Sequence, residues 1–438
     1  IGLKYVHFLS DRTRIVSNLA LSLTRSYERL DSLIDGEYTK MIGEERFKQD
    51  RLLVSSKLIK KFNARNLATV GISFENHFVE YYERYNSIIY NTPDGDSLVL
   101  LPPTISRENS LVVFQSFLEW KHRFSYDLTL YTGMNYLHFF MNNTYSLEPR
   151  TNLQWKISKN QSLSIGYGLH SQLQPFFYYL VKTPTTDDIW DRDNYIQTNR
   201  DLGFTKSHQF AFGYDYSISR NLRLKAEIYY QSLYNIPVES RKSPLSLINV
   251  GAGDEFPQID SLVNQGTGRN SGIEFTLEKF LSNRYYFLTT ASLLDSKYEG
   301  SDGVTRNTTF NIHFNLNALF GYELPLNDRS SLYFNIRGVS AGGRRVVPLD
   351  EERTIEEGMS IYNLEESFEL QLSDYYRLDA RLGYKLNADR ASHEFAIDVT
   401  NLTNRPNEFR RYYNSTTNQI ETMYQQGIFF IAYYRVRF

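Results

Sequence analysis

The sequence predicts an all-β protein, a transmembrane antiparallel up-and-down β-barrel with about 17 strands. Apolar and polar residues alternate with a period of two along most of the chain. Short polar turns alternate with much longer loops, and the chain ends inside an alternating aromatic strand at residues 427–438. Such a chain can present one face of each strand to lipid and the other face to a wet lumen.

The alternation is clearest in five segments, at residues 209–216, 222–230, 311–324, 376–386 and 428–438. In the segment 376–386, every even-numbered residue is apolar or Tyr, and every odd-numbered residue is charged or Gly. Successive side chains of a strand point to opposite faces, so this segment has one apolar face and one polar face. A helix would need an apolar period of about 3.6 residues, and no segment shows that period convincingly.

The connections between the expected strands alternate in length. We expect short turns at residues 10–12, 158–160, 219–221, 282–284, 327–329 and 387–389. We expect long loops near residues 28–50, 85–109, 171–204, 236–268, 343–373 and 404–425. Outer-membrane barrels have this asymmetry, with tight turns on the periplasmic side and longer loops outside.

A soluble antiparallel sandwich is the main alternative, because its strands also alternate apolar and polar residues. Four features favour the membrane barrel: expected strands of about ten to fourteen residues, the difference between turns and loops, the absence of a tail, and Tyr pairs at strand ends. Pairs such as Tyr81-Tyr82 and Tyr433-Tyr434 fit girdles at the level of the lipid headgroups. There a ring lies in apolar matter while its hydroxyl stays wet.

The composition excludes several classes of protein. The mean hydropathy is -0.46, and no run of about 18 apolar residues occurs, so helical membrane spans are excluded. A net charge of -2 lacks the basic field that nucleic-acid binding requires. The absence of Cys excludes disulfides and thiolate sites, and the eight His residues show no zinc-binding spacing. We therefore expect neither enzyme activity nor a cofactor.

The beginning of the chain differs from its end. The first residues already alternate as a strand would, and they lack the features of a signal peptide. An odd number of strands does not close a bacterial single-chain barrel, because an open sheet edge in lipid leaves N–H and C=O groups unpaired. We therefore interpret residues 1–438 as a single barrel domain, the C-terminal portion of a barrel with about 22 strands.

Several short motifs carry a resemblance to a known family. Residues 146–153 and 161–172 resemble the middle strand pair of TonB-dependent receptors, especially those of Bacteroidetes-type bacteria. Further similar motifs follow in the same order at residues 205–216, 226–230, 264–274, 295–298, 342–345 and 399–405. The resemblance is good from about residue 146 to the end, and the order and spacing of the motifs carry it together.

The resemblance implies an outer-membrane active transporter that imports a nutrient, such as a siderophore, a glycan or a peptide, with energy from TonB. The partners that it implies are outer-membrane lipid, the protein's own plug domain, the TonB complex, and a lipoprotein or other outer-membrane protein. Neither a plug nor a TonB-contacting box is recognisable in this sequence, so we expect both to be missing from it. A non-transporting barrel that serves as a scaffold or receptor subunit and a passive porin are the alternatives.

Candidate ligand-binding residues lie in two of the expected loops. Residues 172–179 combine amides and aromatic rings at a strand-to-loop junction, and such a combination suits a ligand platform. Two consecutive Arg residues at 344–345 offer guanidinium forks to an anionic or chelated substrate. Girdle and loop packing, and pairing with loop acids, are the alternatives. The ligand-binding candidates are Gln172, Phe176, Phe177, Trp190, Arg344 and Arg345.

An acidic cluster in the loop 171–204 is a weak candidate for a metal site. Its four carboxylates are those of Asp187, Asp188, Asp191 and Asp193. Hard cations prefer oxygen ligands, but the spacing is not that of an EF-hand. Loop solubility explains the cluster better, and we assign no metal.

Charged residues of both signs lie on the expected lumen face of the last strands. They are Arg377, Asp379, Arg381, Glu394, Asp398, Arg435 and Arg437. The resemblance implies that such rows hold the plug through charged and hydrogen-bonded contacts, which makes them structural and gating residues. It also implies that the terminal Phe438 is part of the signal for the barrel-assembly machinery.

Overall fold

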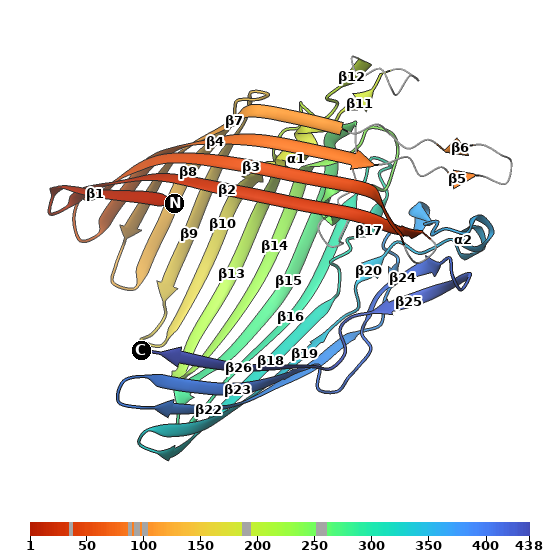
Figure 1. The fold of residues 1–438 in the computed structure, drawn as a ribbon. Helices are drawn as coiled ribbons and strands as arrows, with labels where there is room; N and C mark the ends of the chain where they lie inside the picture. The colour runs from red at the N-terminus through yellow and green to blue at the C-terminus, as the bar shows by residue number, and fades with distance from the viewer. Residues whose placement is uncertain (35–37, 86–89, 92–96, 99–103, 186–193, 251–260) are drawn as a thin grey trace. The chain divides into compact units, whose positions relative to one another are not determined.

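The structure is a computed structural model that describes residues 1–34, 38–85, 90–91, 97–98, 104–185, 194–250 and 261–438. Among these residues, one large sheet holds 18 strands, of which β17 is only 3 residues long (Figure 1). All strand pairs with a described register are antiparallel, which confirms the predicted fold class with its estimate of about 17 strands.

The strands of the large sheet are β1 (Gly2–Ser10), β2 (Thr13–Ile34), β3 (Tyr38–Lys61), β4 (Asn66–Tyr85), β7 (Thr104–Arg123), β8 (Leu128–Phe139), β9 (Thr144–Lys156), β10 (Gln161–Gln172), β13 (Thr205–Ser219), β14 (Leu222–Glu239), β15 (Leu262–Ser282), β16 (Tyr285–Glu299), β17 (Thr305–Asn307), β18 (Phe314–Asn327), β19 (Ser330–Ala341), β22 (Tyr375–Asn387), β23 (Ser392–Thr400) and β26 (Phe429–Arg437). We name the end of a strand at a short predicted turn its turn end, and the opposite end its loop end.

The loops hold short helices and small strand pairs. The helical elements are α1 (Phe176–Leu180), α2 (Glu351–Glu357), η2 (Leu247–Asn249) and η3 (Leu364–Glu366). The strand pairs are β5 (Tyr90–Asn91) with β6 (Ser97–Leu98), β11 (Thr183–Pro184) with β12 (Tyr195–Ile196), β20 (Arg345–Val346) with β21 (Leu370–Gln371), and β24 (Glu408–Asn414) with β25 (Gln419–Tyr424). In the described part of the chain, no helix combines the length and the apolar character that crossing a membrane requires.

The chain divides into two compact units. Unit 1 comprises residues 1–153, 167–208 and 233–267, and unit 2 comprises residues 154–166, 209–232 and 268–438. Each unit has its own run of paired strands and its own loops. The assignment of residues 1–438 to one barrel domain stays a prediction.

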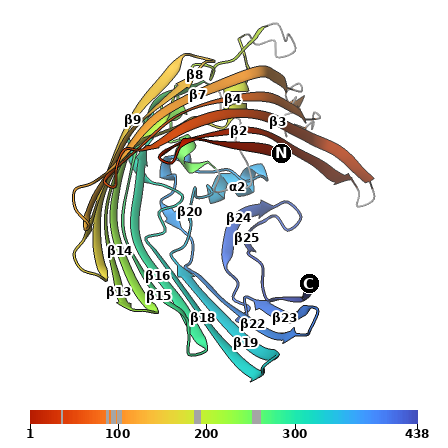
Figure 2. The same cartoon turned by 90° about the vertical axis from the view of Figure 1, so that its left-hand side faces the viewer.

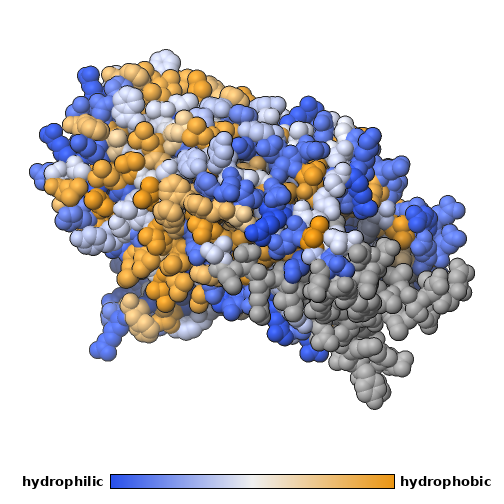
Figure 3. All heavy atoms as spheres, turned by 90° about the horizontal axis from the view of Figure 1, so that it is seen from above, coloured by the Kyte–Doolittle hydropathy of each residue, from blue (hydrophilic) through white to orange (hydrophobic). Residues whose placement is uncertain are grey.

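The register of unit 1 gives its strands one continuous apolar face, which we name the outer face. Leu19 of β2 lies opposite Val54 of β3, Val54 lies opposite Phe74 of β4, and Phe74 lies opposite Phe114 of β7. The first three of these side chains are exposed. Viewed from above, apolar side chains gather in a band beside a hydrophilic left-hand edge (Figure 3). The opposite face, named the inner face, carries polar residues such as His77, which lies opposite Arg51.

Unit 2 is built in the same way. Phe334 of β19 lies opposite Leu382 of β22, which lies opposite Ile397 of β23, and all three side chains are exposed. The neighbouring pair lies on the other face, where Arg381 of β22 is opposite Asp398 of β23. The alternation seen in the sequence therefore becomes an apolar outer face and a charged inner face in each unit.

The predicted short turns are confirmed, because strands end on both sides of each one. The loop predicted at residues 28–50 is wrong, since β2 and β3 extend through most of it and have 22 and 24 residues. The predicted strand length of about ten to fourteen residues is also exceeded by β4, β7, β13, β14, β15 and β16, which have 15 to 21 residues. The charged residues suggested a polar loop, but they form ion pairs across and along the strands, as Arg25 does with Asp50. Arg46 also lies over the ring of Tyr27, at 5.8 Å.

The loops at 343–373 and 404–425 in unit 2 form one body. The elements α2, β20, β24 and β25 lie near one another in both ribbon views (Figures 1 and 2). Arg411 pairs with Glu351 at 2.9 Å. The backbone N–H of Tyr413 donates to the Ser360 hydroxyl at 3.0 Å. These contacts tie the two loops together.

Candidate functional site

In unit 1, the described residues 173–185 and 194–204 of the loop 173–204 pack against the loop ends of β4, β7 and β8. A buried apolar cluster joins them, and the aromatic run of α1 supplies its centre. The buried members of this cluster are Val79, Leu111, Phe139, Tyr178, Tyr179, Leu180, Leu202, Phe204 and Leu262. Alternating inner-face residues of three strands thus provide the apolar base on which the loop rests.

The predicted platform residues Phe176 and Phe177 lie within this packing. The Phe176 ring is 4.6 Å from the His77 ring, and the Phe177 ring is 6.3 Å from the Tyr81 ring. Both Phe side chains are half-buried, whereas Gln172 is exposed. The structure therefore places these three candidates at one junction, where the two rings anchor the loop to the strands.

A polar network lies beside this anchor on the inner face. His77 is buried, and its Nδ1 lies 2.9 Å from the amide nitrogen of Gln49. Its Nε2 lies 3.4 Å from Glu75, which also pairs with Arg51 at 2.7 Å. No sequence motif predicts this network, because its members come from β3 and β4, which are separate segments of the chain.

A second network surrounds Glu148 of β9, which is only 1% exposed. Its Oε2 accepts hydrogen bonds from Asn135 at 2.8 Å and from Arg150 at 2.6 Å. Gln115 donates in turn to Asn135 at 2.8 Å. The other carboxylate oxygen of Glu148 has no hydrogen-bond partner among the described residues. A buried carboxylate oxygen is costly to leave unpaired, so this side chain is suited to receive a donor.

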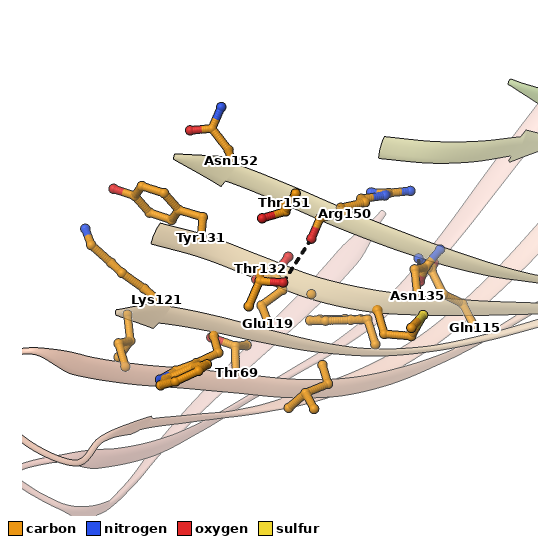
Figure 4. Close-up of a pocket in the computed structure, with 16 residues that line it drawn as sticks. Thr69, Gln115, Glu119, Lys121, Tyr131, Thr132, Asn135, Arg150, Thr151 and Asn152 are labelled. Carbon is orange, nitrogen blue, oxygen red and sulfur yellow. Dashed lines mark hydrogen bonds between the residues drawn. The ribbon is translucent and has the colours of Figure 1, made fainter. Parts of the chain in front are cut away.

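A pocket of about 600 Å³ opens in the same part of unit 1 (Figure 4). Lys121, Tyr131 and Asn152 extend to one side of their strands there, and the Lys121 ammonium lies 4.8 Å from the centre of the Tyr131 ring. The pocket also includes Glu119 and Arg150, so it carries charges of both signs. Such a lining suits a polar, charged partner better than an apolar molecule.

The predicted Arg pair of unit 2 is divided between two kinds of contact. The Arg345 guanidinium donates to the carbonyl oxygens of Asn311 at 3.2 Å, of Phe368 at 3.2 Å and of Glu369 at 3.0 Å. Arg344 lies over the Phe409 ring at 5.7 Å. Arg345 therefore holds the loop 343–373 together, and a ligand would have to compete with these bonds.

The predicted lumen charges of the last strands pair with one another. Arg381 is bonded to Asp398 at 2.5 Å, and Arg377 to Asp379 at 2.7 Å. Arg435 lies 3.5 Å from Glu394. Glu394 also accepts from the Tyr333 hydroxyl at 2.7 Å and the Tyr433 hydroxyl at 3.1 Å. Arg437 and Phe438 are exposed at the end of β26.

Five of the predicted site residues lie outside the described residues. They are Trp190 and the acids Asp187, Asp188, Asp191 and Asp193. In the described ranges, no group of three or more His, Asp or Glu side chains is arranged to hold a metal ion.

Replacement of Tyr178 by Phe is expected to stabilise the loop 173–204. The Tyr178 hydroxyl is buried without a hydrogen-bond partner among the described residues, and an unpaired buried hydroxyl costs about 1 to 3 kcal/mol. Amide hydrogen exchange of residues 176–181 should therefore slow in the Phe variant. Faster exchange in that variant would show that the hydroxyl has a favourable contact.

The same substitution has a pH signature. Burial raises the pKa of Tyr178 to about 12. A raised pKa stabilises the packed loop fully below the ordinary tyrosine pKa of about 10, and that stabilisation is lost as the pH rises through the folded value. Tyr178→Phe should remove this part of the alkaline loss, which near-UV circular dichroism between these two values can measure.

Comparison with known proteins agrees with this architecture. The family model "TonB dependent receptor-like, beta-barrel" matches residues 2–402. No curated protein matches the chain significantly. The ferric preacinetobactin receptor BauA of Acinetobacter baumannii superposes with a TM-score of 0.66 at 13% identity, covering 100% of this chain and 62% of that one.

Two further solved structures show the same fold. The outer membrane transporter YddB of Escherichia coli has a TM-score of 0.63 at 11% identity, covering 99% of this chain and 61% of that one. The ferric yersiniabactin uptake receptor FyuA of Yersinia pestis has a TM-score of 0.64 at 10% identity, covering 97% of this chain and 60% of that one. The chain thus spans about three-fifths of the length of these structures. Because the family model covers residues 2–402 of the 438, the chain belongs to the TonB-dependent receptor-like β-barrel family and is a protein of the bacterial outer membrane.

Proposed function

We propose that this chain is the barrel wall of an active transporter that imports a nutrient across the outer membrane with energy from TonB. Its partners in this proposal are the plug domain and the TonB complex. A lipoprotein or another outer-membrane protein is a further proposed partner. The nutrient is a siderophore, a glycan, a peptide or a similar molecule.

The single observation that supports this proposal best is the polar inner face of unit 1. Glu148 is buried there with one oxygen unpaired among the described residues, and the neighbouring pocket carries charges of both signs. A polypeptide segment with its own donors and charges complements such a wall. A plug domain inside the barrel is that kind of segment, whereas a passive porin leaves its wall to water.

The predicted ligand-binding and plug-contacting residues fit different parts of this proposal. Gln172, Phe176 and Phe177 lie at the loop end, where an external ligand would arrive. The paired charges from Arg377 to Asp398 lie on the inner face of β22 and β23, where they would meet the plug. Arg344 and Arg345 stay the proposed ligand contacts of unit 2, and Arg345 also holds the loop 343–373 through backbone carbonyls.

Uptake by the full-length protein should require TonB. Ferric siderophores are the first ligands to test, because BauA is described as a ferric preacinetobactin receptor, FyuA as a ferric yersiniabactin uptake receptor and PiuA as a siderophore receptor. Cells that produce the protein should accumulate the labelled ligand, and deletion of TonB should reduce accumulation to the level of cells that lack the gene. The measurement is cell-associated label over time with and without a proton uncoupler.

Heat-modifiable migration on a gel is the control that the barrel is folded in each strain. Accumulation that is unchanged when TonB is deleted would contradict active transport and favour a passive porin. Ligand binding at the cell surface without accumulation would favour the receptor or scaffold alternative.

A further inference from the structure

Three short turns lie next to one another at the turn end of unit 1. They follow β1, β3 and β7, at residues 11–12, 62–65 and 124–127. The backbone N–H of Lys61 donates to the carbonyl oxygen of Arg12 at 2.8 Å, and that of Arg123 donates to the carbonyl oxygen of Arg65 at 2.9 Å. These backbone bonds bring three separate sequence segments into one edge of the sheet.

This edge concentrates positive charge. Its cations are Arg12, Arg14, Lys60, Lys61, Arg65 and Arg123, which we name the basic rim. Only two acids, Asp11 and Asp127, lie in residues 11–14, 60–65 and 123–127, so these three segments together have a net charge of +4 in a chain whose net charge is -2. All six cations are exposed, and within the described residues none of them forms an ion pair.

The short turns of unit 2 also carry exposed cations, but fewer of them lie together. Arg220 and Arg284 are single cations in their turns, and Arg329 is paired with Asp389 at 3.0 Å. The turn cations of unit 2 therefore provide a comparison for the basic rim.

Aromatic rings accompany the basic rim on the outer face. The Lys60 ammonium lies 4.9 Å from the centre of the Phe62 ring. Phe62 and Phe124 are each 51% exposed. The His122 ring lies 4.6 Å from the Phe124 ring and 5.2 Å from the Trp120 ring. Apolar rings and free cations thus share the same strand ends.

Asn66 orients the rings of Trp120 and His122. Its side-chain oxygen accepts from Trp120 Nε1 at 3.2 Å and lies 2.7 Å from His122 Nδ1. An amide oxygen only accepts, so Nδ1 of His122 carries the proton in this contact. Trp120 lies on the same face of β7 as Leu118. Leu118 is exposed and lies opposite Val70 on the apolar outer face. Asn66, Trp120 and His122 therefore lie at the border between the apolar outer face and the basic rim.

We propose that the basic rim of unit 1, with the rings of Phe62, Trp120 and Phe124, binds the headgroups of anionic phospholipids in the periplasmic leaflet. Short turns of outer-membrane barrels face the periplasm, so this border meets the phospholipid leaflet. Aromatic rings are at home at the headgroup level, and cations there attract lipid phosphate. A cell-wall polymer or an acidic periplasmic protein would need the cations but not exposed rings beside a lipid-facing band.

The test compares two charge-matched triple variants of the full-length protein. Lys60→Gln/Arg65→Gln/Arg123→Gln removes three cations of the basic rim. Arg220→Gln/Arg284→Gln/Arg390→Gln removes three exposed turn cations of unit 2. Native mass spectrometry of the detergent-solubilised protein counts bound lipid in equal mixtures of phosphatidylglycerol and phosphatidylcholine. Heat-modifiable migration shows that each variant is folded.

We expect the wild-type protein to retain phosphatidylglycerol preferentially. Each cation at a membrane surface contributes a factor of roughly five, so the rim variant, which lacks three, should lose about a hundredfold of this preference. The unit 2 variant should keep it. If the triple rim variant does not assemble, Lys60→Gln alone should lose about fivefold, and Arg220→Gln is its control.

Three outcomes would overturn the proposal. They are an unchanged preference in the rim variant, an equal loss in both variants, and a wild-type protein with no preference. Co-sedimentation with purified peptidoglycan sacculi is measured in parallel. A rim variant that loses sacculus binding but keeps its lipid preference would assign the surface to the cell wall instead.

Discussion

Replacement of Tyr179 by Ala is expected to release the loop 173–204 from the strands of unit 1. The Tyr179 side chain is 0% exposed, and its ring lies 5.2 Å from the ring of Phe139 in an edge-to-face arrangement. Truncation of a fully buried aromatic side chain costs about 3 to 5 kcal/mol, because it loses the burial and leaves a cavity. Trypsin cleavage after the exposed Lys182 should become much faster, and hydrogen exchange of residues 176–181 should rise with it.

The matched control for this prediction is Tyr179→Phe. The Phe ring fills the same space and loses only the hydroxyl, which accepts a hydrogen bond from the backbone N–H of Gln174 at 3.3 Å. That loss should cost about 0.5 to 1.5 kcal/mol. Equal protection of Lys182 in the wild-type and Ala proteins would show that other contacts hold the loop in place.

A β-carbon at position 343 is expected to disrupt the base of the loop 343–373. An added methyl group there would overlap the carbonyl oxygen of Leu372, and one at Gly342 would overlap that of Ile312. Both neighbours are backbone atoms that no side-chain rotation can move. Gly343→Ala should therefore separate β20 from β21 and destabilise the loop by about 3 kcal/mol or more. Hydrogen exchange of residues 344–346 and 370–372 measures this separation.

Gly338→Ala is the control, five residues upstream in β19. The nearest atom to a β-carbon at Gly338 is a methyl carbon of Leu378 at 4.0 Å, which is ordinary contact. This variant should be as stable as the wild-type protein or slightly more stable, because Ala loses less backbone entropy on folding. Similar exchange rates in the two Ala variants would show that the loop base adapts to the added carbon.

Within the predicted site, some side chains hold the loops in place. Phe176 rests on His77 and Phe177 on Tyr81, while Arg345 bonds three backbone carbonyls. Substitution at these positions would change loop structure as well as any ligand contact. Gln172 is exposed, so this position suits a direct test of ligand contact.

Much of the fold could be predicted because it follows from local pattern. The alternation at 376–386 predicts the two faces of β22, and the polar residues at 327–329 predict the turn between β18 and β19. The loop predicted at 28–50 fails for a physical reason. Cross-strand and along-strand ion pairs let polar residues continue β2 and β3, and a local measure of polarity cannot distinguish such strands from a loop.

The candidate site was predictable only in part. Sequence reasoning named Phe176 and Phe177 from their clustering with amides, but it did not identify the strand residues beneath them. Glu148 lies within the motif at residues 146–153, but no local feature of the sequence distinguishes this buried acid from an exposed one. The basic rim was not predicted, since its cations come from three segments that the sequence keeps far apart.

The sequence by itself determined the strands, their faces, the short turns and the family, because period-two alternation, turn residues and motif order are all read along the chain. The tertiary structure alone decided which charges neutralise one another, which rings anchor a loop, and which turns share one charged surface. Strand pairing brings Arg381 to Asp398 and Arg12 to Lys61, and packing of the loop helix α1 against β4 brings Phe176 to His77. Register is set by the pairing of whole strands and not by the residues near any one position.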